Sequence, residues 1–180
     1  MKAHAHTKEF TAIYEAEADA IFRFCLVKVS DRELALDLTQ ETFSRLWQTL
    51  EKGTAMKNTR AFLFAVVNHL IIDWYRRKKA VSYERDEDGG GEPIEPADES
   101  TRFADLEMGA EGRFLLRKIN ELHPSYREAV YLRYVEGLSP PDIGAALGIS
   151  SNAVSVRINR GLEELKKITG YDDISQHEHP

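Results

Sequence analysis

The sequence predicts an all-α protein of two small helical domains joined by an acidic linker. Several segments carry apolar residues three and four positions apart, the spacing of one helix face, and none shows the alternation of a half-buried strand. Serine, aspartate, proline and glycine stand where these segments would begin or end. A stretch rich in acids and glycine divides the 180 residues into two parts, each long enough for a small domain.

The first domain is expected over residues 8–80 and opens with two helices. The side chains that the first helix, about residues 8–29, would bury are Phe10, Ile13, Ile21, Cys25, Leu26 and Val29. Ser30-Asp31-Arg32-Glu33 resembles a capping box, so a second helix is expected to begin there and to run to about Glu51, with Gly53 as its terminator. Its buried side would consist of Leu36, Phe43, Leu46 and Leu50.

The second helix also carries a continuous polar face. Its members, spaced three and one residues apart, are Asp37, Gln40, Glu41, Ser44 and Arg45. The pattern alone fits simple solvation as well as it fits a surface for another protein.

Residues 62–79 read FLFAVVNHLIIDWYRRKK. This run is shorter than the 20 or so residues of a membrane span and contains a charge. On a helix, one side would carry Leu63, Val67, Leu70, Ile71 and Trp74, and the other would carry His69, Asp73 and Arg76. Arg77 lies one turn beyond Asp73 and is expected to pair with it. A polar stripe that runs into four cations suits a nucleic acid whose phosphates and bases are both contacted.

Charge is unevenly distributed along the chain. The formal net charge is −6, but residues 57–80 hold six cations and one acid, whereas residues 81–111 hold eleven acids and two cations. Residues 81–110 contain little that could form a core, so we expect a flexible or extended linker there. Two roles for this linker are possible: it could act only as a tether, or its negative charge could also cover the basic surface of the protein.

The second domain is expected over residues 111–170. Leu115, Leu116 and Ile119 indicate one helix, and a second follows His123-Pro124 and ends at Gly137. Ser139 would cap a third, Gly148 would make a tight turn, and Ser150 or Ser151 would cap a longer fourth helix. Two helices joined in this way, the second one cationic, match the helix-turn-helix pattern.

The last helix has an inward and an outward face. Val154, Ile158, Leu162 and Leu165 would face the core, and Val156, Asn159 and Arg160 would face outward, with Ser155 and Arg157 at the flanks. Arginine, asparagine and valine can read guanine, adenine and the thymine methyl group. A helix-turn-helix corner also occurs in proteins that never touch DNA, but the polar outward set favours DNA binding.

Enzymatic function has the least support. The sequence shows no phosphate loop, no acid and base paired at helical spacing and no cluster of metal ligands, so no catalytic residue, metal or cofactor is expected. A single cysteine, Cys25, excludes an internal disulfide and a cysteine-rich zinc site, and its apolar surroundings indicate a buried thiol.

Three motifs follow one another along the chain. Two precede the acidic linker, DLTQETFSRLW and RAFLFAVVNHLIIDWYRRKK, and one follows it, EGLSPPDIGAALGISSNAVSVRINRGLEEL. Together they resemble an extracytoplasmic-function (group IV) sigma factor of bacterial RNA polymerase, over about residues 8–80 and 111–168. The resemblance implies a first domain like sigma region 2, a second like sigma region 4, and a cytoplasmic, signal-responsive factor that directs promoter-specific initiation. Its implied partners are core RNA polymerase, promoter DNA and an anti-sigma protein, with no small-molecule substrate and no membrane insertion.

The resemblance also assigns roles to residues. The implied polymerase-binding residues are Asp37, Gln40 and Glu41. Those implied to open and read the minus-ten element are Lys57, Arg60, Asn68, His69, Arg76, Arg77, Lys78 and Lys79. Those implied to contact the minus-thirty-five element are Arg133, through a phosphate, and Ser155, Val156, Arg157, Asn159 and Arg160. The family commonly has Asn at position 69, a basic residue at Ser155 and a Gly-Thr pair at Asn152-Ala153, so this chain is expected to read an atypical promoter.

Two other classes of protein share part of this pattern. A stand-alone helix-turn-helix regulator would leave the polar face from Asp37 to Arg45 unexplained. A sigma mimic that only binds an anti-sigma protein would have little use for Arg160 and the cations at 76–79.

Overall fold

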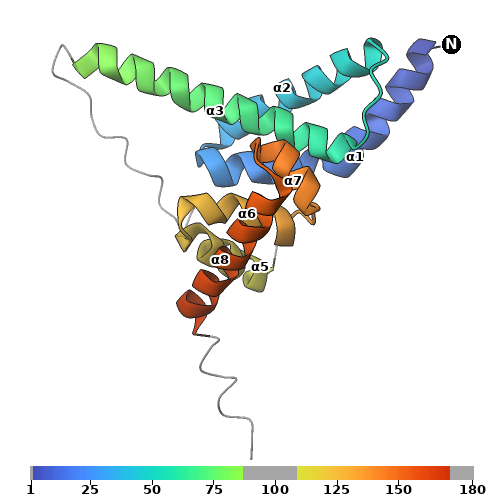
Figure 1. Cartoon of the computed structure of the whole chain (residues 1–180). Coiled ribbons are helices and arrows are strands. Elements are labelled where there is room, and N and C mark those ends of the chain that lie inside the picture. The colour runs from blue at the N-terminus through green and yellow to red at the C-terminus, as the bar shows by residue number, and fades with distance from the viewer. Residues whose placement is uncertain (1, 87–108, 171–180) are drawn as a thin grey trace, which may run out of the picture. The chain divides into compact units, whose positions relative to one another are not determined.

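The computed structural model describes residues 2–86 and 109–170, and these form helices without a strand (Figure 1). The expected all-α class is confirmed. The chain divides into two units, Met1–Asp105 and Leu106–Pro180. Most of the predicted acidic linker, residues 87–108, lies outside the described residues.

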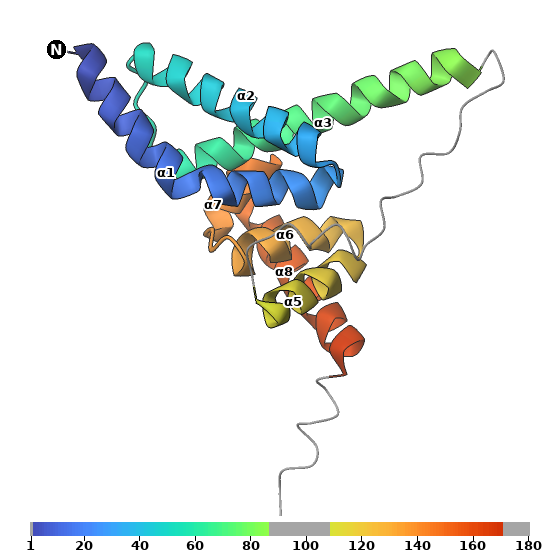
Figure 2. The same ribbon diagram turned by 180° about the vertical axis from the view of Figure 1, so that it is seen from behind.

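The first unit consists of α1 (Lys2–Val29), α2 (Arg32–Glu51) and α3 (Thr59–Asp86), each of which contacts the other two (Figures 1 and 2). α1 begins six residues earlier than expected, and α3 continues to Asp86, inside the segment predicted to be linker. The largest fully buried side chains of this unit are Ile21, Phe24, Leu46, Leu63, Phe64, Val67 and Ile71. The rings of Phe24 and Phe64 meet edge to face, with centroids 5.4 Å apart, and thereby join α1 to α3.

The turn between α1 and α2 differs from the predicted capping box. Asp31, not Ser30, caps α2, because its Oδ1 accepts a hydrogen bond of 3.0 Å from the amide of Leu34. Ser30 adopts φ +56° and donates its amide to the carbonyl of Leu26, so it ends α1 instead. A residue with left-handed backbone often terminates a helix, which explains why the cap moves on by one position.

Cys25 is buried, as expected, and lies between α1 and α2. Thr39 on α2 directs its hydroxyl to the sulfur at 3.8 Å and to the carbonyl of Ala35 at 2.7 Å. Burial raises the pKa of the Cys25 thiol to about 12, although the hydrogen bond from Thr39 lowers it in part. The thiol is therefore part of the core.

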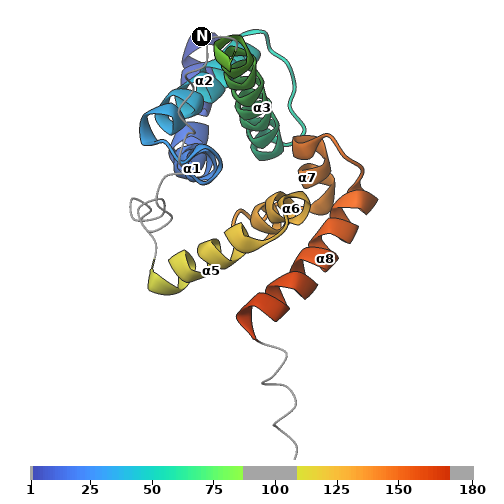
Figure 3. The same cartoon turned by 90° about the vertical axis from the view of Figure 1, so that its left-hand side faces the viewer.

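The second unit consists of α5 (Ala110–Glu121), α6 (Pro124–Tyr134), α7 (Pro140–Leu147) and α8 (Ser151–Thr169). α8 packs against the other three, and Figure 3 shows the corner that α7 and α8 form. The expected caps are confirmed: Ser139 accepts from the amide of Asp142, Gly148 adopts φ +68°, and Ser150 accepts from the amide of Ala153. The α7–α8 pair is therefore a helix-turn-helix.

Gly161 sets the distance between α8 and α6. A Cβ at this position would lie 2.5 Å from Cγ2 of Val130 and 3.1 Å from Cβ of Tyr126. The first distance is too short for real atoms and the second is unusually tight, so the close approach of the two helices requires glycine here. Within the parts of the chain described above, no helix has the length and apolarity to cross a membrane.

Because of this close approach, Gly161→Leu should destabilise the second unit. Forcing atoms into a packed helix interface costs about 1–3 kcal/mol or more. Chemical denaturation followed by circular dichroism should show that loss. Glu163→Leu, an exposed site on the same helix, is the matched control and should change stability by about 0.5 kcal/mol or less. Equal stability of the two variants would contradict the close packing.

Candidate functional site

α3 has two faces. Leu63, Val67, Leu70 and Ile71 are buried against the rest of the first unit. His69, Asp73 and Arg76 are exposed on the other side, as the helical spacing predicts. The loop of residues 52–58 ends at Asn58, whose Oδ1 accepts a hydrogen bond of 3.0 Å from the amide of Ala61 and so caps the helix. Lys57 is exposed immediately before this cap.

Asn68 and His69 lie in opposite environments, although both were expected to contact the minus-ten element. Asn68 is 5% exposed and interacts within the protein. His69 is exposed, and its Nδ1 lies 2.8 Å from the carbonyl oxygen of Ala65. Consecutive helical residues point about 100° apart, which brings one of the pair into the core and the other to the surface. Of the two side chains, only that of His69 is accessible to a ligand on this face of α3.

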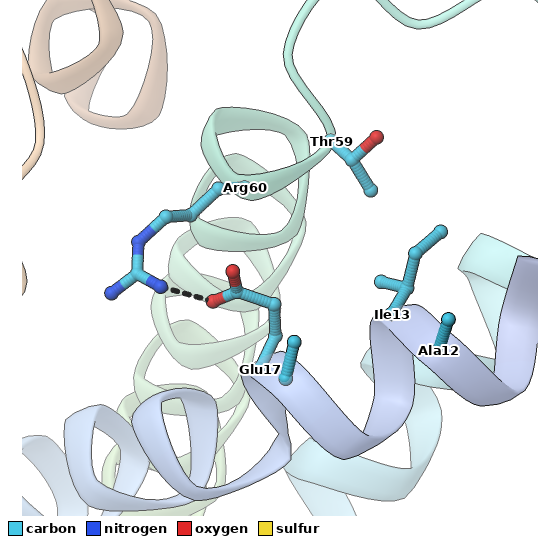
Figure 4. A pocket seen from close by; sticks show the side chains of 6 residues that line it. Ala12, Ile13, Glu17, Thr59 and Arg60 are labelled. Carbon is cyan, nitrogen blue, oxygen red and sulfur yellow. Dashed lines mark hydrogen bonds and ion pairs between the residues drawn. The ribbon is translucent and has the colours of Figure 1, made fainter.

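Arg60 lies away from the polar stripe. Nine residues separate it from His69, which is two and a half helical turns, so the two side chains leave α3 on opposite sides. The guanidinium of Arg60 pairs with the carboxylate of Glu17 on α1 and sits over the ring of Phe64, 5.6 Å from its centroid. Figure 4 shows the side chain reaching across to Glu17. The sequence does not predict this pair, because its members lie 43 positions apart.

A small hollow lies between α1 and the start of α3 beside this ion pair (Figure 4). Its volume is about 220 Å³, and its lining residues are Ala12, Ile13, Ala16, Glu17, Thr59 and Arg60. Arg60 thus holds the beginning of α3, and with it the preceding loop, against α1.

The cationic end of α3 is organised around Asp73 and Trp74. Nη1 of Arg76 lies 3.8 Å from Oδ1 of Asp73, whereas Nε of Arg77 donates to the backbone carbonyl of Asp73 at 3.3 Å. The expected ion pair of Asp73 with Arg77 is therefore replaced by one with Arg76. Lys78 extends over the ring of Trp74, 4.6 Å from its centroid. Arg76, Arg77 and Lys79 are exposed, so positive charge dominates this surface.

α2 presents the expected polar face. Asp37, Gln40, Glu41 and Ser44 are all exposed. Nε of Arg45 lies 3.0 Å from Oε1 of Glu41, which holds Arg45 along the helix. The opposite side is buried by Ala35, Leu38, Thr39, Thr42, Phe43, Leu46 and Leu50. The exposed face therefore carries acids and amides on a firmly packed helix.

α8 presents the outward set that its sequence predicts. Ser155, Val156, Asn159 and Arg160 are exposed, and Arg157 is half-buried. Val154, Ile158 and Gly161 are buried on the side that packs. The hydroxyl of Ser155 donates to the carbonyl of Ser151 at 3.1 Å, so in this conformation it offers lone pairs and no proton to a ligand.

Arg133 braces the segment that leads into the helix-turn-helix. It is exposed, and its Nη1 donates to the carbonyl of Leu138 at 3.0 Å. Beneath it, the hydroxyl of Tyr131 donates to Oε1 of Glu136 at 2.8 Å, and Glu136 is 5% exposed. This buried carboxylate was not predicted, because nothing in the sequence distinguishes it from a solvated one.

Comparisons with known proteins identify both units. The family described as Sigma-70 region 2 matches residues 13–81, and the family described as Sigma-70, region 4 matches residues 115–165. The RNA polymerase sigma factor CarQ of Myxococcus xanthus is 32% identical over 164 residues, which cover 89% of each chain. This chain belongs to the extracytoplasmic-function sigma factors of bacterial RNA polymerase.

Other sigma factors are also similar to this one in sequence. The sigma factor SigW of Bacillus subtilis is 28% identical, over 88% of this chain and 87% of its own. The sigma factor SigE of Mycolicibacterium smegmatis is 32% identical over 83% of this chain, which spans 57% of that relative. Two solved structures share the fold. The first is the sigma factor RpoE in complex with the anti-sigma factor NepR from Bartonella quintana, with 23% identity and a TM-score of 0.66 over 92% of this chain and 99% of that one. The second is CnrH in complex with the cytosolic domain of CnrY, with 21% identity and a TM-score of 0.62 over 95% of this chain and 96% of that one.

The contact between Arg60 and Glu17 predicts a structural role for Arg60. A double-mutant cycle with Glu17→Ala and Arg60→Ala should give a coupling energy of about 0.2–1 kcal/mol in the stability of the first unit. Arg60→Ala should leave the salt dependence of promoter binding unchanged, whereas Lys57→Ala, at the exposed end of the loop, should lower the log–log slope by about 0.9. A lower slope for Arg60→Ala without coupling to Glu17 would return Arg60 to the DNA-binding residues.

Proposed function

We propose that this sigma factor directs core RNA polymerase to promoters by dividing the work between its two units. Residues 8–80 act as the sigma region 2 module, which docks the polymerase and opens the minus-ten element. Residues 111–170 act as the region 4 module, which binds the minus-thirty-five element. The observation that carries this proposal is the division of α3 into a buried apolar face and an exposed polar and cationic one.

In the first unit, the exposed face of α2 docks the largest polymerase subunit through Asp37, Gln40 and Glu41. α3 then contacts the promoter. His69 touches a base edge, while Lys57 and the cations Arg76, Arg77, Lys78 and Lys79 hold phosphates. Asn68 is assigned to the core and Arg60 to the contact with Glu17 because of the burial and pairing described above.

Melting the promoter needs a compensating interaction. Each base-pair step that opens costs about 1.4 kcal/mol of stacking. Capture of an unstacked base on an aromatic or apolar surface returns about 1–3 kcal/mol, and binding of phosphates adds to it. A helix whose packed face holds it rigid while its other face is exposed can supply both kinds of interaction.

In the second unit, α8 enters the major groove. Val156, Asn159 and Arg160 contact base edges, and Ser155 and Arg157 flank them. The exposure of Val156, Asn159 and Arg160 supports this role. Arg133, braced on the carbonyl of Leu138, holds a phosphate beside the groove. An arginine at such a position fixes the register of the helix on the duplex without reading its sequence.

We further propose that an anti-sigma protein holds this factor inactive in the cytoplasm. The solved structures that share its fold are complexes of sigma factors, one with the anti-sigma factor NepR and one with the cytosolic domain of CnrY. The chain is proposed to act as an initiation factor without enzymatic activity of its own.

Run-off transcription tests the function directly. The full chain, core polymerase and a library of promoter-length duplexes should together yield transcripts from defined start points. Core polymerase alone serves as the control. Binding to DNA without transcripts would instead indicate a stand-alone regulator, and failure to bind core polymerase would indicate a sigma mimic.

Removing the exposed cations of α3 should impair opening. Arg76→Ala with Arg77→Ala should reduce the open complex and lower the log–log salt slope of promoter binding by about 0.7–0.9 for each phosphate that is no longer neutralised. Permanganate footprinting and filter binding at several salt concentrations measure the two quantities. Lys8→Ala, which removes an exposed cation from α1, is the control and should change neither. An unchanged slope in the double variant would contradict the binding of phosphates at this end of α3.

A further inference from the structure

The hydrogen bond of His69 fixes the arrangement of protons on its ring. Nδ1 lies 2.8 Å from the carbonyl oxygen of Ala65, one turn earlier on α3. A carbonyl oxygen can only accept, so Nδ1 carries the proton of the neutral imidazole. Nε2 is then left with a lone pair and no hydrogen. In the described part of the chain, no hydrogen bond occupies this second nitrogen.

The same bond also fixes where the ring lies. A side chain bound to the carbonyl four residues earlier leans toward the N-terminal end of its helix. On α3 that end carries the cap of Asn58 and the loop before it. Between the loop and His69 the same helix face consists of Phe62, Ala65 and Val66, all half-buried. His69 therefore stands at the edge of a partly exposed apolar strip, whose chemical character suits the face of a base.

Two polar groups lie beside this strip. Oδ1 of Asn58 is occupied by the amide of Ala61, so the side chain of Asn58 has only its NH2 donors to offer at the loop end of the strip. Asp73, one turn beyond His69, is an exposed carboxylate, and it is turned toward Arg76. A base whose edge reaches Nε2 thus meets a lone pair, with a second negatively polarised group one turn away.

We propose that His69 makes this sigma factor select an amino base, adenine or cytosine, over a keto base at one position of the minus-ten element. Adenine N6 and cytosine N4 donate a hydrogen bond at the place where guanine O6 and thymine O4 present a carbonyl oxygen. An amino group satisfies Nε2, and a carbonyl oxygen opposes it. This inference rests on the proposed function of α3.

An asparagine, the common residue of the family at this position, does not impose the same choice. Its amide presents a donor and an acceptor and can rotate to offer either. The amino preference is therefore specific to a histidine held as His69 is.

Promoter selection tests the inference. Libraries randomised in the minus-ten element are transcribed by core polymerase with the wild-type chain, His69→Ala or His69→Asn. The wild-type chain should favour adenine or cytosine by about 10-fold at one position. Both variants should lose that preference and keep the preferences at the other positions. Lys8→Ala should match the wild-type profile throughout.

A second, independent experiment removes the exocyclic amino group of the selected promoter base. Replacing the selected adenine by purine, or the selected cytosine by pyrimidin-2-one, should lower wild-type transcription by about 10-fold and leave His69→Ala unaffected. Nitrogen NMR of the labelled chain should show the proton of His69 on Nδ1.

The outcomes separate the two proposals. If the wild-type chain yields no transcript from any member of the library, the proposed function fails. If it yields transcripts but His69→Ala retains the amino preference, or the wild-type chain prefers a keto base that His69→Ala does not, only the inference is overturned. A proton found on Nε2 overturns it as well.

Discussion

The burial of one face of α3 is the constraint on which the first unit depends. Phe64, Val67 and Ile71 are fully buried in this unit, and the edge-to-face contact of Phe24 with Phe64 fixes the rotation of α3 relative to α1. A helix turned by one residue would expose Asn68 and bury His69, because consecutive residues are about 100° apart. The packing of apolar side chains thus decides which polar groups a ligand can meet.

In the second unit, helix caps and glycines orient the exposed side chains. Its helices are short, and their ends are set by side-chain caps and left-handed glycines at defined positions. The missing side chain of Gly161 lets α8 lie close to α6. Once that approach and the α7–α8 corner are fixed, Val156, Asn159 and Arg160 must face away from the core. Here the backbone geometry, more than the volume of the core, orients the functional residues.

Much of this arrangement follows from the sequence because it is local. Helical spacing predicted most of the buried side chains of α2, α3 and α8, although Leu36, Leu162 and Leu165 are half-buried. The chemistry of Ser139, Gly148 and Ser150 predicted where α7 begins and ends and where α8 begins. α6 was expected to end at Gly137 but ends at Tyr134. Asp31 displaced Ser30 as the cap because Ser30 takes a left-handed conformation, which no residue pattern announces. α3 runs past residue 80 to Asp86, although the composition of that segment had suggested a linker. Of its last residues, Glu84 and Arg85 are good helix formers.

Interactions between distant segments could not be predicted in this way. The pairing of Arg60 with Glu17 joins two helices whose relative placement only the tertiary structure supplies. The burial of Glu136 beside Tyr131, only five residues away, could not be predicted either, because nothing in the sequence distinguishes this carboxylate from a solvated one. Helical spacing put His69 on the polar face of α3, but only the structure shows that Asn68 is buried.

The contact of Lys78 with Trp74 has a spectroscopic consequence. The chain contains two tryptophans, Trp47 and Trp74, and both belong to the first unit. An ammonium group held 4.6 Å from the centre of an indole ring perturbs its excited state, which is more polar than its ground state. Under selective excitation of tryptophan, the fluorescence therefore comes only from the first unit, because the second unit contains no tryptophan. The emission wavelength of Trp74 depends on the position of the Lys78 ammonium group.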